Sequence, residues 1–137
     1  MNIGHIENGI VLDHITAGNS MNIYNVLHLG ELDCTVALIK NADSPKMGKK
    51  DIIKISTHMD LDLDVLGYLD PGITVNIIRD GVVAERRTLS LPQRVVGVIQ
   101  CKNPRCITSS ERGIVHEFKL TDPAKKVYRC IYCEQKA

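Results

Sequence analysis

The sequence predicts an α+β protein in two unequal parts, and three observations support this fold class. Strand-like and helix-like hydrophobic patterns alternate through the first two thirds of the 137 residues. Residues 1–93 hold 8 Lys and Arg against 12 Asp and Glu, a formal charge of −4, whereas residues 94–137 hold 9 against 4, a charge of +5. Four of the five cysteines also lie after residue 100. We therefore expect one domain over residues 1–93 and a smaller one over residues 94–137.

The first part begins with a strand, a helix and two further strands. The apolar run over residues 9–15 predicts a strand. The Asn-Ser pair at residues 19–20 is typical of a helix N-cap, an apolar helical face follows it, and Gly30 is expected to end this helix. Residues 35–40 and 51–56 predict two strands, and the polar residues between them are expected to form a loop.

The first part ends with a helix and a hairpin. Residues 60–69 alternate at their start like a strand, but their apolar side chains also fit a helical stripe and their early aspartates favour a helix N-terminus, so we predict a helix. Pro71-Gly72 ends it. Residues 73–79 and 82–89 predict a hairpin around Asp80-Gly81, a favoured two-residue turn. The order β-α-β-β-α-β plus an extra strand is a ferredoxin-like arrangement.

The cysteines of the second part have the spacing of a metal site. Two close pairs, C-x4-C and C-x2-C, are separated by 23 residues, and each short loop can turn two thiolates towards one point. The pattern favours one structural Zn2+ in a small all-β domain of zinc-ribbon or rubredoxin-like type. Two disulfides or free buried thiols are the alternatives. The predicted ligands are Cys101, Cys106, Cys130 and Cys133.

The size of the second part supports the zinc interpretation. A segment of this length buries too little apolar surface to fold comfortably alone, and metal binding contributes on the order of 10 kcal/mol to such a fold. Four thiolates around one Zn2+ would lower the charge of this part from +5 to about +3. We expect residues 92–98 to form a connector, and Phe118, Tyr128 and Tyr132 to form a small core. Cys34 is expected to be a core residue of the first part.

No catalytic motif stands out in the sequence. It contains no G-x-S-x-G, H-E-x-x-H or glycine-rich dinucleotide pattern. Lys50 and Lys54 share one face of their predicted strand, and together with Arg86 and Arg87 they could hold a polyphosphate. A solvated sheet face explains the same spacing. The Asp-His pair at residues 13–14 ends an apolar strand, where the carboxylate could accept hydrogen bonds from sugar hydroxyls or simply cap the strand.

Several runs of the sequence together resemble one known family. They are residues 9–15, 47–55, 74–76, 89–92, 101–107 and 128–134. In this order they closely resemble the regulatory chain of aspartate carbamoyltransferase, and the resemblance covers essentially the whole chain. The combination is highly specific, whereas any one run alone would not be.

The resemblance implies a function and partners. It implies a non-catalytic, allosteric subunit of pyrimidine biosynthesis, whose N-terminal domain binds the nucleotide effectors CTP and ATP. The zinc domain would contact the catalytic chain. Regulatory chains of this family pair through their N-terminal domains, and the dimers join two catalytic trimers.

The resemblance also implies site residues. Asp13 and Lys54 would contact the ribose, and His14, Lys50 and Arg86 would lie near the phosphates. Facing the base would be the backbone around Ile6 and the region from Asn76 to Val83. The zinc ligands of the family coincide with the four cysteines of the second part.

Composition limits the other partners and the compartment. The acidic first part disfavours general nucleic-acid binding, and no apolar run approaches the roughly 20 residues of a membrane-spanning helix. We expect no signal peptide, and therefore a cytoplasmic protein that contacts neither nucleic acid nor membrane. Two alternatives remain open: a zinc-ribbon nucleic-acid-binding protein, supported by the +5 segment with Tyr128 and Tyr132, and a small enzyme with an unrecognised site.

Overall fold

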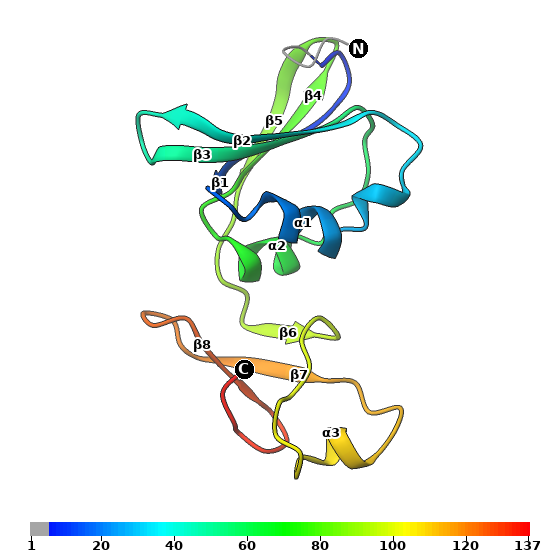
Figure 1. The fold of residues 1–137 in the computed structure, drawn as a ribbon, viewed down its shortest axis with the longest axis vertical. Coiled ribbons are helices and arrows are strands. Elements are labelled where there is room, and N and C mark those ends of the chain that lie inside the picture. Colours follow the sequence, from blue (N-terminus) through cyan, green and yellow to red (C-terminus); the bar gives the residue numbers. More distant parts are fainter. Residues whose placement is uncertain (1–5) are drawn as a thin grey trace. The chain divides into compact units, whose positions relative to one another are not determined.

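A computed structural model describes residues 6–137. The chain divides into two compact units between Ser90 and Leu91, and each unit has its own sheet (Figure 1). No helix in the described part of the chain is long and apolar enough to cross a lipid bilayer.

The first unit is a five-stranded antiparallel sheet in the order β2-β3-β1-β4-β5, with two helices on one face (Figure 1). Its elements are β1 (Gly9–Thr16), α1 (Ser20–Val26), η1 (Leu29–Glu31), β2 (Val36–Ser44), β3 (Gly48–Ile55), α2 (Leu63–Leu69), β4 (Thr74–Arg79) and β5 (Val82–Thr88). The order and directions are those of a β-α-β-β-α-β unit with β5 added at one edge. The predicted ferredoxin-like fold is confirmed.

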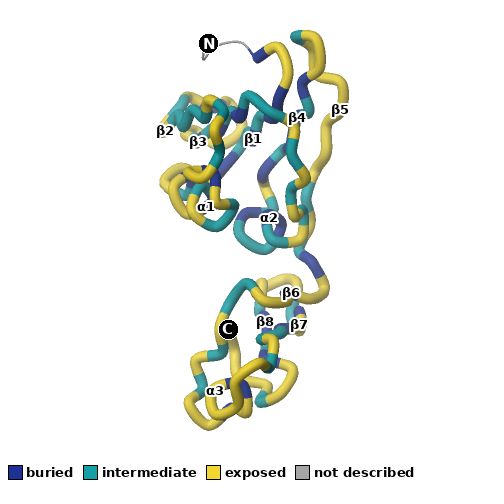
Figure 2. The backbone as a smooth tube through the Cα atoms, turned by 90° about the vertical axis from the view of Figure 1, so that its right-hand side faces the viewer, coloured by how far each residue is buried: buried dark blue, intermediate teal, exposed yellow. Residues whose placement is uncertain are grey.

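Alternation along the strands forms the core of this unit. In the three central strands β3, β1 and β4, the side chains on the face towards the helices are buried. Helices α1 and α2 and the turn η1 add further apolar side chains to the same cluster. Figure 2 shows β1 alternating between buried and intermediate residues and β5 exposed along its length. The fully buried cluster consists of Ile10, Leu12, Ile15, Ile23, Leu29, Ile53, Ile55, Leu66, Ile73 and Val75. Cys34 packs against this cluster as a partly buried side chain.

The predicted polar loop over residues 41–49 is wrong. Strands β2 and β3 continue through it and pair as far as Ser44 and Gly48, so only residues 45–47 form a turn. Most side chains of this hairpin end are exposed, which explains its polar composition. Backbone hydrogen bonds rather than apolar burial hold the strands together here. A pattern of apolar residues in the sequence therefore does not predict this part of the hairpin.

The two helices begin and end differently from the prediction. Helix α1 ends at Val26, not at Gly30, which lies in the short 3-10 turn η1. Asn19 occupies the N-cap position, but its side chain makes no capping hydrogen bond. Helix α2 begins only at Leu63, where the Asp62 carboxylate accepts hydrogen bonds from two backbone N–H groups of the first turn.

The second unit is a three-stranded antiparallel sheet in the order β6-β7-β8. Its elements are β6 (Arg94–Val96), α3 (Ile107–Ser110), β7 (Glu117–Asp122) and β8 (Val127–Cys130). Its cysteines lie in the loop before α3 and at and after the end of β8. The expected connector over residues 92–98 is therefore wrong, because its centre is a strand. Phe118 and Tyr128 are buried as predicted, but Tyr132 is 47% exposed and does not belong to the core.

Candidate functional site

The sheet face of the first unit opposite the helices carries a row of polar side chains. In the strand register, Lys54 of β3 lies opposite Val11 of β1, Val11 lies opposite Asn76 of β4, and Asn76 lies opposite Arg86 of β5. Residues opposite one another in neighbouring strands share a face. Three residues that the family resemblance singles out are thus brought to one row that crosses four strands.

A β-bulge in β1 shapes the end of this face. The register between β1 and β3 shifts between Leu12 and Ile15, and His14 within the bulge has a φ of 59°. Asp13 Oδ1 accepts a 2.7 Å hydrogen bond from the His14 backbone N–H, and His14 Nδ1 lies 3.1 Å from Thr74 Oγ1. Bulges re-aim side chains at binding sites, and this one fixes both members of the Asp-His pair.

Two polar contacts connect the predicted residues to one another. Lys50 Nζ lies 2.9 Å from Asp13 Oδ1, and both side chains are mostly buried. Burial alone would raise the pKa of Asp13, but hydrogen bonds from Lys50 and the His14 backbone outweigh it and hold this pKa below its ordinary value. Arg86 Nε donates a 3.0 Å hydrogen bond to Asn76 Oδ1. The face therefore presents two ordered cation–oxygen pairs.

The remaining predicted residues lie at the next row of the sheet. Gly9 of β1 pairs with Ile78 of β4, which pairs with the half-exposed Val83 of β5. Ile6 is buried against Gly9, since a Cβ at that glycine would lie 3.1 Å from Ile6 Cγ2. This row is apolar, in contrast to the neighbouring polar one.

Arg87, by contrast, lies on the other face of the sheet. It pairs with the buried Val75 of β4 and bonds to Glu85, and it lines a pocket on the helix side. Adjacent residues of a strand point to opposite faces, so Arg86 and Arg87 cannot serve one site together.

A buried carboxylate lies on the helix side of strand β3, and the sequence did not single it out. Asp51 of β3 is 0% exposed and accepts hydrogen bonds of 3.0, 3.2 and 3.0 Å from the backbone N–H groups of Gly18, Ser20 and Asn41. It thereby replaces the missing Asn19 cap at the start of α1. The available signal was its position in phase with Ile53 and Ile55, the core-facing residues of the same strand.

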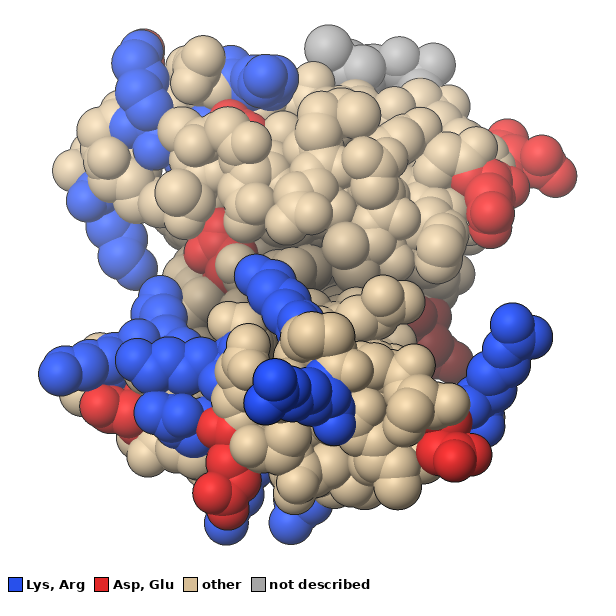
Figure 3. Space-filling view, turned by 60° about the horizontal axis from the view of Figure 1, so that its bottom comes forward, with Lys and Arg blue, Asp and Glu red and all other residues tan. Residues whose placement is uncertain are grey.

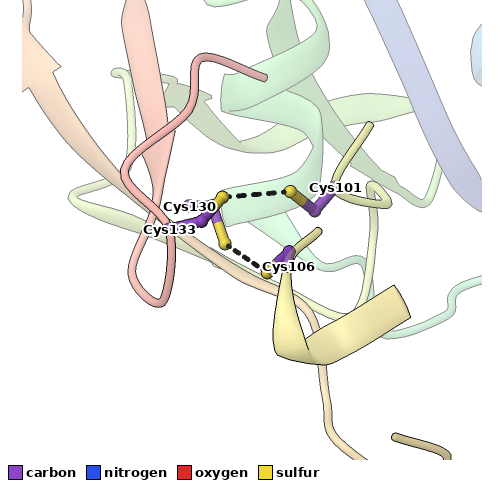
Figure 4. A group of neighbouring side chains, drawn as sticks. All are labelled: Cys101, Cys106, Cys130 and Cys133. Atoms are coloured by element: carbon purple, nitrogen blue, oxygen red, sulfur yellow. Dashed lines mark hydrogen bonds between the residues drawn. The ribbon is translucent and has the colours of Figure 1, made fainter. Parts of the chain in front are cut away.

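The four cysteines of the second unit form one cluster. Figure 4 shows their side chains pointing towards one another from the loop before α3, the start of α3, the end of β8 and the loop after it. Their sulfur atoms all lie within 4.8 Å of one another, and two pairs are 3.5 and 3.8 Å apart. The members are Cys101, Cys106, Cys130 and Cys133.

This cluster fits a tetrahedral metal ion and not two disulfides. Thiolates 2.3 Å from a tetrahedral centre are about 3.8 Å apart, whereas disulfide sulfurs are about 2.05 Å apart. The cysteines are free, and their sulfur separations match the first geometry. The residues present therefore suit a metal with four sulfur ligands and no open position.

Nearby donors orient the thiols and make them unequal. Thr108 Oγ1 donates a 3.1 Å hydrogen bond to Cys106 Sγ, and Thr108 lowers the pKa of that thiol. Burial raises the pKa of Cys101 to about 12, whereas hydrogen bonds from the Gln135 backbone and Asn103 lower that of Cys133 to about 6. Metal binding requires thiolates, so a bound divalent cation would displace the protons that the metal-free cluster retains.

The fold and the two side-chain clusters define a class of protein: an α+β domain with a polar sheet face, joined to a small domain whose four cysteines suit a metal ion. The family description "aspartate carbamoyltransferase regulatory chain, allosteric domain" matches residues 1–90, and "aspartate carbamoyltransferase regulatory chain, metal binding domain" matches residues 93–137. The chain belongs to the aspartate carbamoyltransferase regulatory chain family. It is a non-catalytic regulatory subunit with an allosteric and a metal-binding domain.

Individual relatives with this name are similar to the chain over nearly their whole length. The aspartate carbamoyltransferase regulatory chain of Clostridium acetobutylicum is 54% identical over 135 residues, which cover 98% of this chain and 92% of the relative. That of Clostridium tetani is 50% identical over 98% of this chain and 94% of the relative. That of Bifidobacterium longum is 44% identical over 100% and 99%. The predicted family is confirmed.

Proposed function

We propose that this chain binds the nucleotide effectors CTP and ATP on the polar sheet face of its first unit and so regulates the catalytic chain of aspartate carbamoyltransferase. The observation that carries the proposal is the register that joins Lys54, Asn76 and Arg86 in one row, with Asp13 and Lys50 beside it. The cations Lys50 and Arg86 suit phosphate oxygens, and Asp13 with Lys54 suits the hydroxyls of the ribose. The neighbouring apolar row at Ile6 and Val83 suits the flat face of a base.

The second unit supplies the link to the partner in this proposal. One structural Zn2+ bound by the four thiolates would fix the loops around α3 and β8, because its four bonds join both loops to one point. A tetrathiolate site has no position left for substrate, so the role of the ion would be structural. Reduced thiols persist in the cytoplasm, which we propose as the location of the protein. The chain pairs with a second copy, and the resulting dimers join two catalytic trimers.

Allosteric control requires a difference between two states. A nucleotide changes the activity of the partner only if it binds one quaternary state more tightly than the other, by typically about 1–3 kcal/mol. The regulatory chain itself is expected to turn over no substrate.

The test is an assay of the cognate catalytic trimer with and without this chain, titrated with CTP and with ATP. We expect size-exclusion chromatography to show that the chain converts the trimer into a larger assembly. We expect at least one nucleotide to change the catalytic rate of this assembly and to leave that of the trimer alone unchanged. A trimer whose size and rate are unaffected by the chain would refute the proposal.

Lys54→Ala is expected to weaken nucleotide binding strongly. A hydrogen bond to a charged group contributes about 1.5–3 kcal/mol, which corresponds to roughly a ten- to hundredfold loss of affinity. Isothermal titration calorimetry with CTP and ATP measures the loss. Lys49→Ala is the matched control, because Lys49 pairs with the exposed Asp43 at the hairpin end and should leave affinity unchanged. Equal affinities of the two variants would remove Lys54 from the site.

A further inference from the structure

Four cations lie opposite one another across the outer face of the second unit's sheet. Arg94 of β6 pairs with Lys119 of β7, Lys119 pairs with Arg129 of β8, and Arg129 forms a bridge with Lys136. Their side chains share one face, because the alternate positions Val95, Phe118 and Cys130 are buried. We call these four residues the cationic row. Figure 3 shows lysines and arginines gathered on this unit.

The cationic row is poorly neutralised from within the chain. Like charges directly opposite in a sheet destabilise it, and neighbours in such a row stand about 5 Å apart. Among the described residues only Arg94 has a carboxylate partner, Glu117, while Arg129 Nη1 donates to the carbonyl of Glu134 at 3.0 Å. Lys119 and Lys136 form no ion pair with the described part of the chain. The row therefore retains a surplus of positive charge that an external anionic group would offset.

A second row lies beside the cationic row and carries two exposed aliphatic side chains with a carboxylate between them. Val96 of β6 pairs with Glu117 of β7, and the Ile131 backbone N–H donates to the Glu117 carbonyl, so these residues follow one another across the same face. Val96 is 53% exposed and Ile131 is 39% exposed. A groove on this face is lined by three cations, one carboxylate and one exposed aliphatic side chain among its residues. They are Arg94, Lys119, Thr121, Arg129, Cys130, Ile131 and Glu134.

The composition of this face indicates the chemistry of its occupant. Exposed aliphatic side chains next to cations suit a protein surface with carboxylates flanking an apolar patch. A single-stranded nucleic acid would use aromatic stacking, and the lining of the groove contains no aromatic residue.

We propose that the cationic row, together with the neighbouring exposed side chains of Val96 and Ile131, is the docking face of this unit for an acidic surface of the catalytic chain. This inference rests on the proposed function and adds to it which face makes the contact and what chemistry it meets. Charges of this kind chiefly accelerate association, and their effect is screened by salt.

The experiment measures association of the full chain with the cognate catalytic trimer by surface plasmon resonance at several NaCl concentrations. Lys119→Glu combined with Arg129→Glu is expected to slow association at low salt by about tenfold or more and to flatten its salt dependence. Arg112→Glu combined with Lys125→Glu makes the same charge change at exposed positions outside the row and should remain within about twofold of the native rate. Zinc content and circular dichroism confirm that both variants are folded.

The outcomes separate the two proposals. A native chain that assembles, together with a Lys119/Arg129 variant that assembles equally fast with the same salt dependence, would overturn this inference and leave the regulatory function standing. A native chain that does not assemble would overturn both. Salt-dependent binding of single-stranded RNA that only the row variant loses, with assembly unchanged, would assign the face to nucleic acid instead.

Discussion

Removing the metal is expected to unfold residues 91–137 while the five-stranded sheet of residues 6–90 persists. The second unit has a short sheet and few large buried side chains, and metal binding contributes on the order of 10 kcal/mol to folds of this size. Four sulfurs within 4.8 Å would also repel one another as thiolates without a cation between them. Chelation followed by heteronuclear NMR should show loss of dispersion for the second unit only, with CTP binding preserved.

Single cysteine variants provide the matched comparison. Cys130→Ser should abolish stoichiometric zinc binding and assembly with the catalytic trimer, because Cys130 is a buried member of the cluster at the end of β8. Cys34→Ser changes the same functional group in the first unit, outside the cluster, and should leave zinc content at one ion per chain. A Cys130 variant that retains a full equivalent of tightly bound zinc would contradict the four-sulfur site.

Asp51→Ala is expected to destabilise the first unit strongly. It leaves three backbone N–H groups without their acceptor, and each unsatisfied buried donor costs about 1–3 kcal/mol, so the total loss is on the order of 4 kcal/mol. Urea denaturation, followed by the NMR signals of β1 and β3, measures it. Asp43→Ala is the control, because Asp43 lies on the exposed hairpin end and should change stability by less than about 1 kcal/mol.

The same carboxylate makes the first unit sensitive to acid. Burial would raise the pKa of Asp51, but hydrogen bonds from Ser20, Asn41 and Gly18 outweigh it and lower this pKa below the value of the unfolded chain. The stabilisation is therefore complete above the unfolded-state pKa of about 3.9 and is lost as the pH falls through the lower folded-state pKa. Asp51→Asn should show a flatter dependence of unfolding free energy on pH between about 5 and 2 than the native chain. Identical slopes would show that Asp51 does not carry this linkage.

Local patterns predicted most of the fold. The alternation of apolar residues located the central strands β1, β3 and β4, because these bury one face against the helices. The predicted hairpin turn at Asp80-Gly81 is present. Both residues adopt the positive φ that such a tight turn requires, 52° and 79°. The cysteine spacing identified all four members of the sulfur cluster.

Long-range pairing accounts for what the sequence alone did not reveal. The end of the β2–β3 hairpin is held by backbone pairing of exposed residues, and the start of α1 is held by a carboxylate 31 residues away from Ser20. The cationic row of the second unit likewise exists only through register, since its members are distant in sequence. Spacing predicted that Lys50 and Lys54 share a face, but the row that joins Lys54 to Asn76 and Arg86 depends on which strands are neighbours.

Neighbouring positions 50 and 51 of β3 give the first unit a short mechanical connection. Lys50 holds Asp13 on the open face, and Asp51, one peptide bond further on, holds the start of α1 and the backbone of β2 on the other. An anion bound by Lys50 would therefore sit one residue along the chain from the carboxylate that orders a helix terminus and the neighbouring strand.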